Sequence, residues 1–197
     1  MNTLLLIILS LVLLGVIIGV IVYLVNREGY ENENPLLNLL TKIQDNNDII
    51  VTFCDNKYIK LADYWVNNIN NMNIKNYLII ASDSKAYNYL KNKNINSFLI
   101  EKNTNSFWVY RMLIIQFIIN NGFNVIHSDL DAIWVKNILP LFNNKKIDLY
   151  ISQGTIFPKQ HLKKHNFVLC CGLFYLKSNN RTIYFLKQYI KMLKKIK

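Results

Sequence analysis

Apolar runs of strand length alternate with segments of helical periodicity along most of the chain after residue 48. The runs are rich in β-branched residues and predict strands at Ile49–Cys54, Tyr77–Ala81, Ser97–Ile100, Val125–Ile126, Asp148–Ser152 and Phe167–Leu176. Helical spacing of apolar residues predicts helices over Lys57–Asn70, after Ser82-Asp83-Ser84, over Phe107–Asn121 and from Asn180 onward. Continuous apolar strands separated by helices are typical of a mainly parallel sheet with helices on both faces. The pattern therefore predicts an α/β fold.

The connections carry their own signals. Gly122 directly after the apolar helix is typical of a left-handed helix cap. The stretch Ile133–Phe142 is expected to be a short connector, and Ile156–Asn166, with Pro158 and three lysines, to be a polar loop. His161 and His165 inside that loop are spaced four apart, which on a helix would be one face and a possible zinc site; we expect exposed histidines instead.

The most apolar part of the chain is Leu4–Val25, which has no charged residue. As a helix this segment is about 33 Å long, enough to cross the hydrocarbon core of a bilayer. A cleaved signal peptide is the competing interpretation, but the segment has no basic start and no small-residue cleavage site. We therefore expect a membrane anchor at 1–25, a stem at 26–48 with an amphipathic stretch, and one domain at 49–197. Arg27 slightly favours a cytosolic body and does not settle the orientation.

Charge and cysteine content add little to this picture. The net charge of +11 is a signal for nucleic-acid binding, but lysine, asparagine, isoleucine and tyrosine are abundant throughout, so we expect no nucleic-acid partner. The lysines at the end of the chain are explained by a solvated helix face. Cys54, Cys170 and Cys171 are too few for a disulfide framework, and we expect small buried hydrophobes.

Asp129 and Asp131 stand two residues apart where the strand through Val125 and Ile126 ends. In an open α/β sheet, ligands bind at the carboxyl ends of strands. Two carboxylates at this edge suit Mn²⁺ or Mg²⁺, which takes few protein ligands and shares the others with phosphate and water. A solvated turn is the alternative for an isolated Asp-x-Asp triplet. His127, just before the pair, is expected to be structural.

The order of these features resembles the nucleotide-diphospho-sugar transferase family, glycosyltransferases with a single-Rossmann-like (GT-A) fold. The stretch Gly122–Trp134 is similar to the family's metal motif, and Cys170–Ser178 is similar to its second signature. The likeness extends from about Ile49 to Met192, including Val51-Thr52-Phe53, Tyr77–Asp83 and an Arg-bearing apolar helix at Tyr110–Asn121. Many family members also have one N-terminal membrane helix and face the Golgi lumen.

The resemblance implies a metal-dependent glycosyltransferase that moves a sugar from a nucleotide-diphosphate donor to a glycan or glycoprotein acceptor. It implies that Asp129 and Asp131 hold Mn²⁺ or Mg²⁺. Donor-binding positions would be Thr52, Asp83, Arg111, Asp129 and Leu130, with Cys171 and Gly172 contacting donor or acceptor. Ordinary alternatives exist for two of these: Asp83 as a helix N-cap and Arg111 as a surface-reaching side chain. No catalytic base is identifiable.

Two departures from the family pattern leave an alternative open. Cys170 stands where the second signature carries Asn, Asp or Thr, and no histidine follows His165 to serve as a third metal ligand. Water would then complete the metal sphere, or the protein would be a shortened, catalytically inactive, membrane-tethered nucleotide-sugar-binding protein. We expect residues 4–25 to contact the bilayer, which would make the chain a single-pass protein of type II in Golgi or ER. A body that faces the cytosol is the second possibility.

Overall fold

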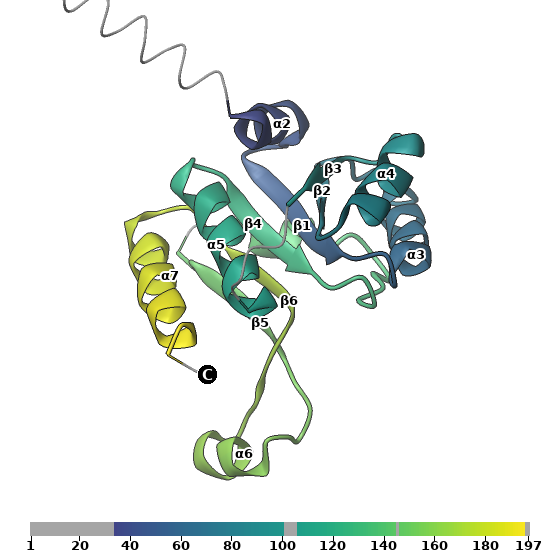
Figure 1. Cartoon of the computed structure of the whole chain (residues 1–197). Helices are drawn as coiled ribbons and strands as arrows, with labels where there is room; N and C mark the ends of the chain where they lie inside the picture. Colours follow the sequence, from purple (N-terminus) through teal and green to yellow (C-terminus); the bar gives the residue numbers. More distant parts are fainter. Residues whose placement is uncertain (1–33, 101–105, 145, 196–197) are drawn as a thin grey trace, which may run out of the picture. The chain divides into compact units, whose positions relative to one another are not determined.

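The computed structural model describes residues 34–100, 106–144 and 146–195 (Figure 1). The expected membrane anchor and the beginning of the stem, residues 26–33, lie outside these residues. Within the described part, no helix combines the length and apolar character needed to cross a membrane. The chain divides into two compact units, residues 1–39 and 40–197, and the second one contains the sheet.

Helices and strands alternate as the sequence pattern predicts. The helices are α2 (Pro35–Ile43), α3 (Ile59–Asn70), α4 (Ser84–Asn92), α5 (Phe107–Asn120), α6 (Lys159–His165) and α7 (Asn180–Leu193), with a 3₁₀ turn η1 at Leu139–Asn143. The strands are β1 (Asp48–Cys54), β2 (Tyr77–Ala81), β3 (Ser97–Leu99), β4 (Asn124–Ser128), β5 (Leu149–Gln153) and β6 (Leu169–Leu176). All six predicted strands form, with ends shifted by one or two residues.

One six-stranded sheet organises this unit, in the order β3-β2-β1-β4-β6-β5. The first four strands are mutually parallel: Val51 lies beside Leu78 of β2 and His127 of β4. β6 is antiparallel to both β4 and β5. The expectation of a mainly parallel sheet is confirmed. Because β1 and β4 are parallel neighbours, the residues that follow them emerge at the same edge of the sheet.

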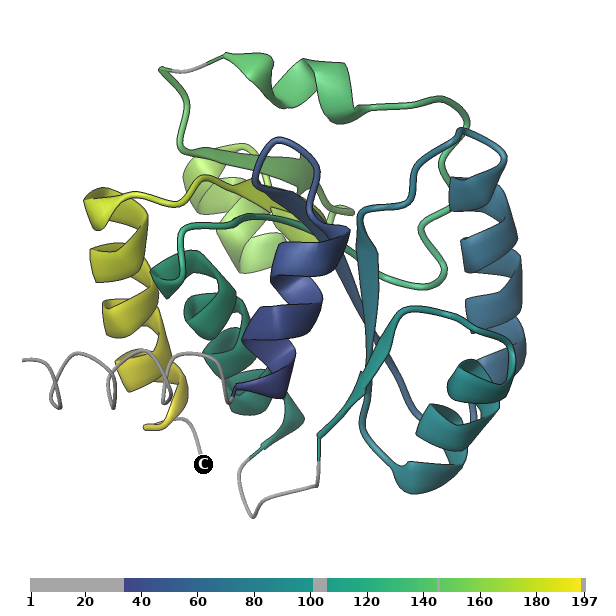
Figure 2. The same ribbon diagram turned by 90° about the horizontal axis from the view of Figure 1, so that it is seen from above.

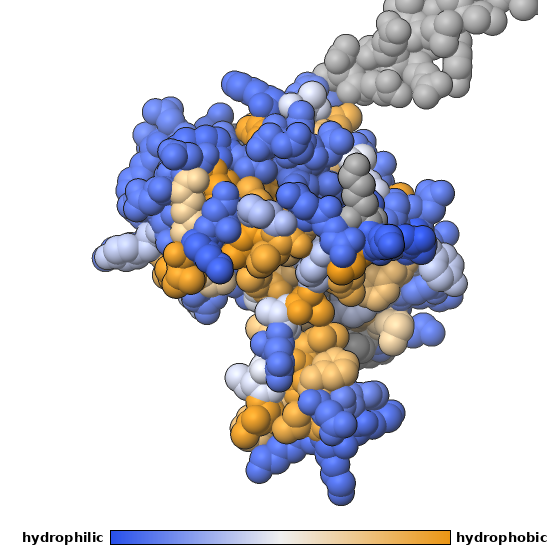
Figure 3. Space-filling model, turned by 180° about the vertical axis from the view of Figure 1, so that it is seen from behind, coloured by the Kyte–Doolittle hydropathy of each residue, from blue (hydrophilic) through white to orange (hydrophobic). Residues whose placement is uncertain are grey.

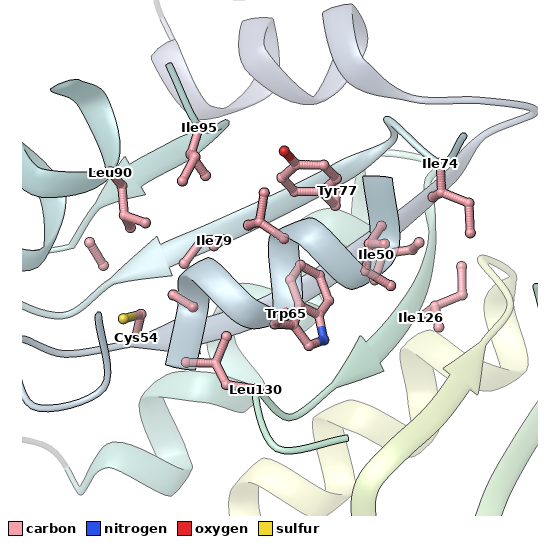
Figure 4. Close-up of a cluster of buried hydrophobic side chains, with 14 of the residues drawn as sticks. Ile50, Cys54, Trp65, Ile74, Tyr77, Ile79, Leu90, Ile95, Ile126 and Leu130 are labelled. Atoms are coloured by element: carbon pink, nitrogen blue, oxygen red, sulfur yellow. The ribbon is translucent and has the colours of Figure 1, made fainter. Parts of the chain in front are cut away.

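Two helix layers cover the sheet: α3 and α4 lie on one side, and α5 and α7 on the other (Figure 2). Side chains alternate between these faces along each strand. Ile50, Ile79 and Ile126 pack under α3 against Trp65, which is fully buried in a cluster of core side chains (Figure 4). On the other face α5 buries Ile115, Ile118 and Ile119. This double cover explains why β2 is buried along its whole length.

Helix α5 ends as predicted. Asn121 closes its last turn, and Gly122 follows with φ +90°, a backbone conformation that glycine adopts with little strain. The chain then enters β4 directly. The short reversal between α5 and β4 therefore sets where Asp129 emerges from the sheet.

The expectation of a loop over Ile156–Asn166 is wrong, because α6 forms inside it. Residues 154–168, which connect β5 to β6 and are called the arm below, project away from the sheet (Figure 1). The sequence of α6 has a single aliphatic side chain, Leu162, so its apolar periodicity is too weak to predict a helix. Apolar side chains remain exposed on the arm, among them Phe157 and Phe167 (Figure 3).

Candidate functional site at the carboxyl edge of the sheet

Asp129 leaves the sheet at the carboxyl end of β4 and is fastened there by its backbone. Its N–H donates to the carbonyl of Gly172 in β6 at 2.7 Å, and its own carbonyl accepts from Ala132 at 3.0 Å. The chain therefore turns sharply just after β4. The two motifs found in the sequence, around Asp129 and around Gly172, meet at this point.

The segment after Asp129 is held against α3 by a set of buried hydrogen bonds. The indole N–H groups of Trp65 and Trp134 both donate to the hydroxyl oxygen of Ser128 at 3.1 Å. Asn68 in α3 pairs with the backbone of Trp134 in both directions, each bond being 2.9 Å long. Because both ends of residues 128–134 are fixed, the loop that carries the two aspartates has a defined conformation.

One carboxylate oxygen of Asp129 faces two buried nitrogen groups. His127 Nε2 lies 2.9 Å from Asp129 Oδ1, and Arg111 Nη1 lies 3.5 Å from the same oxygen. Arg111 Nη1 is also 3.2 Å from His127 Nε2. Burial lowers the pKa of His127, and the nearby Arg111 acts in the same direction, while the contact with Asp129 opposes it. Arg111, whose guanidinium is permanently charged, places a positive charge beside Asp129.

Arg111 is buried rather than surface-reaching, so the alternative interpretation of this residue is wrong. Its side chain is only 8% exposed, and its guanidinium carbon lies 4.7 Å from the centre of the Trp108 ring. Among the described residues its Nε has no hydrogen-bond partner. Burying a cation with an unsatisfied N–H is costly, and the nearby carboxylate of Asp129 offsets part of that cost.

The second oxygen of Asp129 lies beside Gly172. A Cβ atom added to Gly172 would be 3.1 Å from Asp129 Oδ2, so the absence of a side chain keeps this space open. The side chain of Asp129 is 43% exposed, and Asp131 is exposed. Within the described residues no three His, Cys, Asp or Glu side chains are gathered as a ready cage. A half-exposed carboxylate beside the open space at Gly172, with an exposed second carboxylate two residues later, suits Mg²⁺ or Mn²⁺, which completes its sphere with phosphate and water.

The remaining predicted donor residues have varied environments. Thr52 has no exposed surface, and its hydroxyl has no partner among the described residues. Asp83 is the N-cap of α4: its carboxylate accepts from Ala86 N–H at 2.9 Å and from Asn56 N–H at 2.8 Å. Leu130 is buried in the core, and Cys171 is exposed next to Gly172. Donor contacts of these residues stay predictions.

The three cysteines are free thiols. Cys54 is buried as expected, and burial raises the pKa of its thiol to about 12. The same expectation is wrong for Cys171, which is exposed, and Cys170 is intermediate. His161 and His165 do share a helix face, with ring centres 6.2 Å apart, and both are exposed as predicted.

An apolar cavity of about 230 Å³ adjoins the site on the α5 and α7 side of the sheet. Its wall includes Arg111 and Cys171, which connect it to Asp129 and Gly172. Leu149, Leu169 and Phe185 form an exposed rim, and the deeper wall contains Phe174, Leu176 and Leu186. No pattern along the chain predicts this cavity, because its wall combines four separate elements.

Sequence reasoning also missed His127 and Ser128 as parts of the site. In a strand, residues two apart share a face, so the spacing of His127 and Asp129 was an available signal. The convergence of Trp65 and Trp134 on Ser128 joins segments far apart in the sequence and had no local signal.

Comparison with known proteins agrees with this geometry. No match was found among curated proteins. A family model described as nucleotide-diphospho-sugar transferase matches residues 72–196, well over half of the chain, and the match includes Arg111, both aspartates and Gly172. The chain thus belongs to the nucleotide-diphospho-sugar transferase family and is a glycosyltransferase by that membership.

Proposed function

We propose that this protein is a metal-dependent glycosyltransferase that uses a nucleotide-diphosphate sugar and transfers the sugar to a glycan or protein acceptor. One observation carries the proposal: Asp129, at the carboxyl edge of a parallel sheet, keeps one oxygen tied to buried nitrogens and the other open beside Gly172. Family membership supports the reaction class. The metal, its identity and the acceptor are part of the proposal.

The chemistry needs stabilisation of a leaving diphosphate. Sugar transfer breaks the bond between the anomeric carbon and the phosphate oxygen, so negative charge grows on the diphosphate. Mn²⁺ or Mg²⁺ held by Asp129 and Asp131 would supply charge neutralisation there. Arg111 adds a fixed positive charge at the same edge and orients Asp129. Thr52, Asp83 and Leu130 are the further proposed donor contacts, and Cys171 and Gly172 lie where donor or acceptor would approach.

Location forms a separate part of the proposal. The uncharged segment Leu4–Val25 supports a single-pass membrane protein, with a stem at 26–48 and a catalytic domain at 49–197. By analogy with anchored members of the family, we propose a type II protein of Golgi or ER. Protease protection of the catalytic domain in sealed microsomes tests this, and digestion without detergent would place the domain in the cytosol.

The deciding experiment uses residues 34–197, which contain the whole second unit and all of α2. Nucleotide sugars are screened for release of nucleoside diphosphate and for thermal stabilisation, each with Mn²⁺ and with a chelator. Asp129→Ala and Asp131→Ala are expected to abolish metal-dependent binding while the protein stays folded. Asp63→Asn is the matched control, because Asp63 pairs with Lys93 at the surface.

A second candidate function is nucleotide-sugar binding without turnover. It is favoured by the absence, among the described residues, of a third protein ligand near the two aspartates. Metal-dependent stabilisation by a donor with no release of nucleoside diphosphate would establish it. Unchanged metal-dependent binding in both aspartate variants would remove the metal assignment from either candidate.

A further inference from the structure

His127 is a buried titratable side chain for which the proposed chemistry has no use. Its side chain is 1% exposed. The ring lies between aromatic neighbours, with its centre 4.9 Å from that of Phe174 and 5.9 Å from that of Phe53. If packing were its only purpose, phenylalanine would fill this place and avoid burying two ring nitrogens.

Both ring nitrogens have partners in specific directions. Nδ1 lies 3.1 Å from the carbonyl oxygen of Val51 in β1, and Nε2 lies 2.9 Å from Asp129 Oδ1. A carboxylate oxygen and a backbone carbonyl oxygen only accept hydrogen bonds, so a ring nitrogen that bonds to either one does so through its N–H. The 2.9 Å contact between Nε2 and Asp129 Oδ1 therefore has the geometry of an Nε2 hydrogen donated to the carboxylate. Arg111 approaches the same oxygen from 3.5 Å.

These contacts act on only one of the two carboxylate oxygens. With Oδ1 held by His127 and Arg111, rotation of the carboxylate about its last bond is restricted, and Oδ2 is left beside Gly172. Carboxylates that ligate metals are themselves commonly hydrogen-bonded, since a fixed orientation lowers the entropy cost of binding. A freely turning carboxylate would have to be ordered by the cation.

We propose that His127 is a positioning residue that donates its Nε2 hydrogen to Asp129 Oδ1 and thereby aims Asp129 Oδ2 at the cation. This inference rests on the proposed function and assigns a role that the sequence did not predict. His127 itself touches neither the metal nor the donor. Its effect reaches the metal through Asp129.

Two substitutions distinguish a positioning role of His127 from a packing role. The two roles predict opposite orders of Mn²⁺ affinity for the two variants. His127→Phe keeps an aromatic ring between Phe53 and Phe174 and loses the donor. His127→Gln loses the ring and keeps an amide N–H at nearly the same distance along the side chain. We expect the Kd for Mn²⁺ to rise about 10–100-fold in His127→Phe. His127→Gln is expected to keep most of the wild-type affinity, although its melting temperature is the lower of the two.

Mn²⁺ binding to the full-length protein is measured by calorimetry, with donor hydrolysis against Mn²⁺ concentration as a second readout. Under positioning, His127→Phe needs more Mn²⁺ but recovers its kcat when the metal is saturating. Wild-type affinity in His127→Phe together with weak binding in His127→Gln would overturn the inference and assign a packing role. If wild-type protein and Asp129→Ala both fail to bind Mn²⁺ and Mg²⁺, the proposed metal site itself is refuted, a result distinct from the reversed order.

Discussion

The two halves of the sheet, with β1, β2 and β4 in one and β5 and β6 in the other, are built differently. The parallel strands β1, β2 and β4 are buried along almost their whole length between helices, and Leu78 and Ile79 have no exposed surface. In the other half of the sheet, β5 is at most half-buried, and exposed and half-buried residues alternate in the first half of β6, where Leu169 is 52% exposed. The first region has a closed core, whereas the second presents apolar side chains to solvent and encloses the cavity beside Arg111.

Acidic and basic residues are also distributed differently between the two regions. Every aspartate and glutamate of the chain lies at or before Asp148, whereas lysines continue to the last residue. β5, the arm, β6 and α7 therefore carry cations with no acidic side chains among them. The parallel region thus fixes Asp129 in place, while the second region supplies an open, basic and partly apolar surface next to it. A core substitution and an arm substitution of similar size should consequently differ greatly in cost.

The largest effect is expected from Trp65→Ala in the closed region. Trp65 is fully buried and its indole N–H donates to Ser128, so truncation opens a cavity and removes a buried hydrogen bond. We expect unfolding free energy to fall by about 3–5 kcal/mol, measured by urea denaturation. Trp65→Phe is the control that keeps most of the volume and should cost less. A loss below about 1 kcal/mol would mean that this core is not tightly packed.

Gly172→Ala probes the junction of the two regions. Its Cβ would be 3.1 Å from Asp129 Oδ2, so the carboxylate must shift while the backbone is undisturbed. Affinity for Mn²⁺ is expected to fall about tenfold with little change in melting temperature. In Gly154→Ala the new Cβ meets backbone carbonyls of Val168 and Leu169 at 3.3 Å, which strains the base of the arm. That control should lower stability and leave the metal affinity unchanged.

Asp148 ties β5 to the start of α7 and gives a pH test. Its carboxylate accepts from Arg181 Nε at 2.6 Å and from Asn179 at 2.8 Å, and the bond from Arg181 is the main cause of its lowered pKa. A lowered folded-state pKa contributes stability that is complete above the unfolded value, near 3.9, and is lost as pH falls through the folded value. The melting temperature of Asp148→Asn should lie slightly below wild type at pH 7 and converge with it in acid. A gap that persists at the lowest pH would assign the effect to something other than this carboxylate.

The smallest effect is expected in the arm. Phe167 is 49% exposed, so Phe167→Ser removes little buried surface and should change the unfolding free energy by less than about 0.5 kcal/mol. The same denaturation experiment as for Trp65 provides the measurement. A cost comparable to that of Trp65→Ala would show that the arm belongs to the cooperative core.

The features that the sequence predicts and the features that it misses also differ between the two regions. β1, β2 and β4 were predictable because a strand buried on both faces must be apolar throughout, and the polar residues that follow β4 had to reach solvent. The helix α6 was missed because its cations and histidines leave no apolar stripe. The contact of Arg111 with Asp129 depends on how α5 lies against β4, and the cavity depends on four elements together. Such tertiary contacts have no periodic signal in one sequence.

Each of the chain's three tryptophans contacts this edge of the sheet: Trp65 and Trp134 through Ser128, and Trp108 through Arg111. The intrinsic fluorescence of the protein therefore originates beside Asp129. Trp65 and Trp134 are buried and should emit at shorter wavelength, whereas Trp108 is 57% exposed and should emit at longer wavelength and be quenched by acrylamide. Paramagnetic Mn²⁺ or a stacked nucleotide base that binds at this edge would then change the tryptophan emission without any label. The tryptophan whose emission changes would show on which side of Asp129 the ligand is bound.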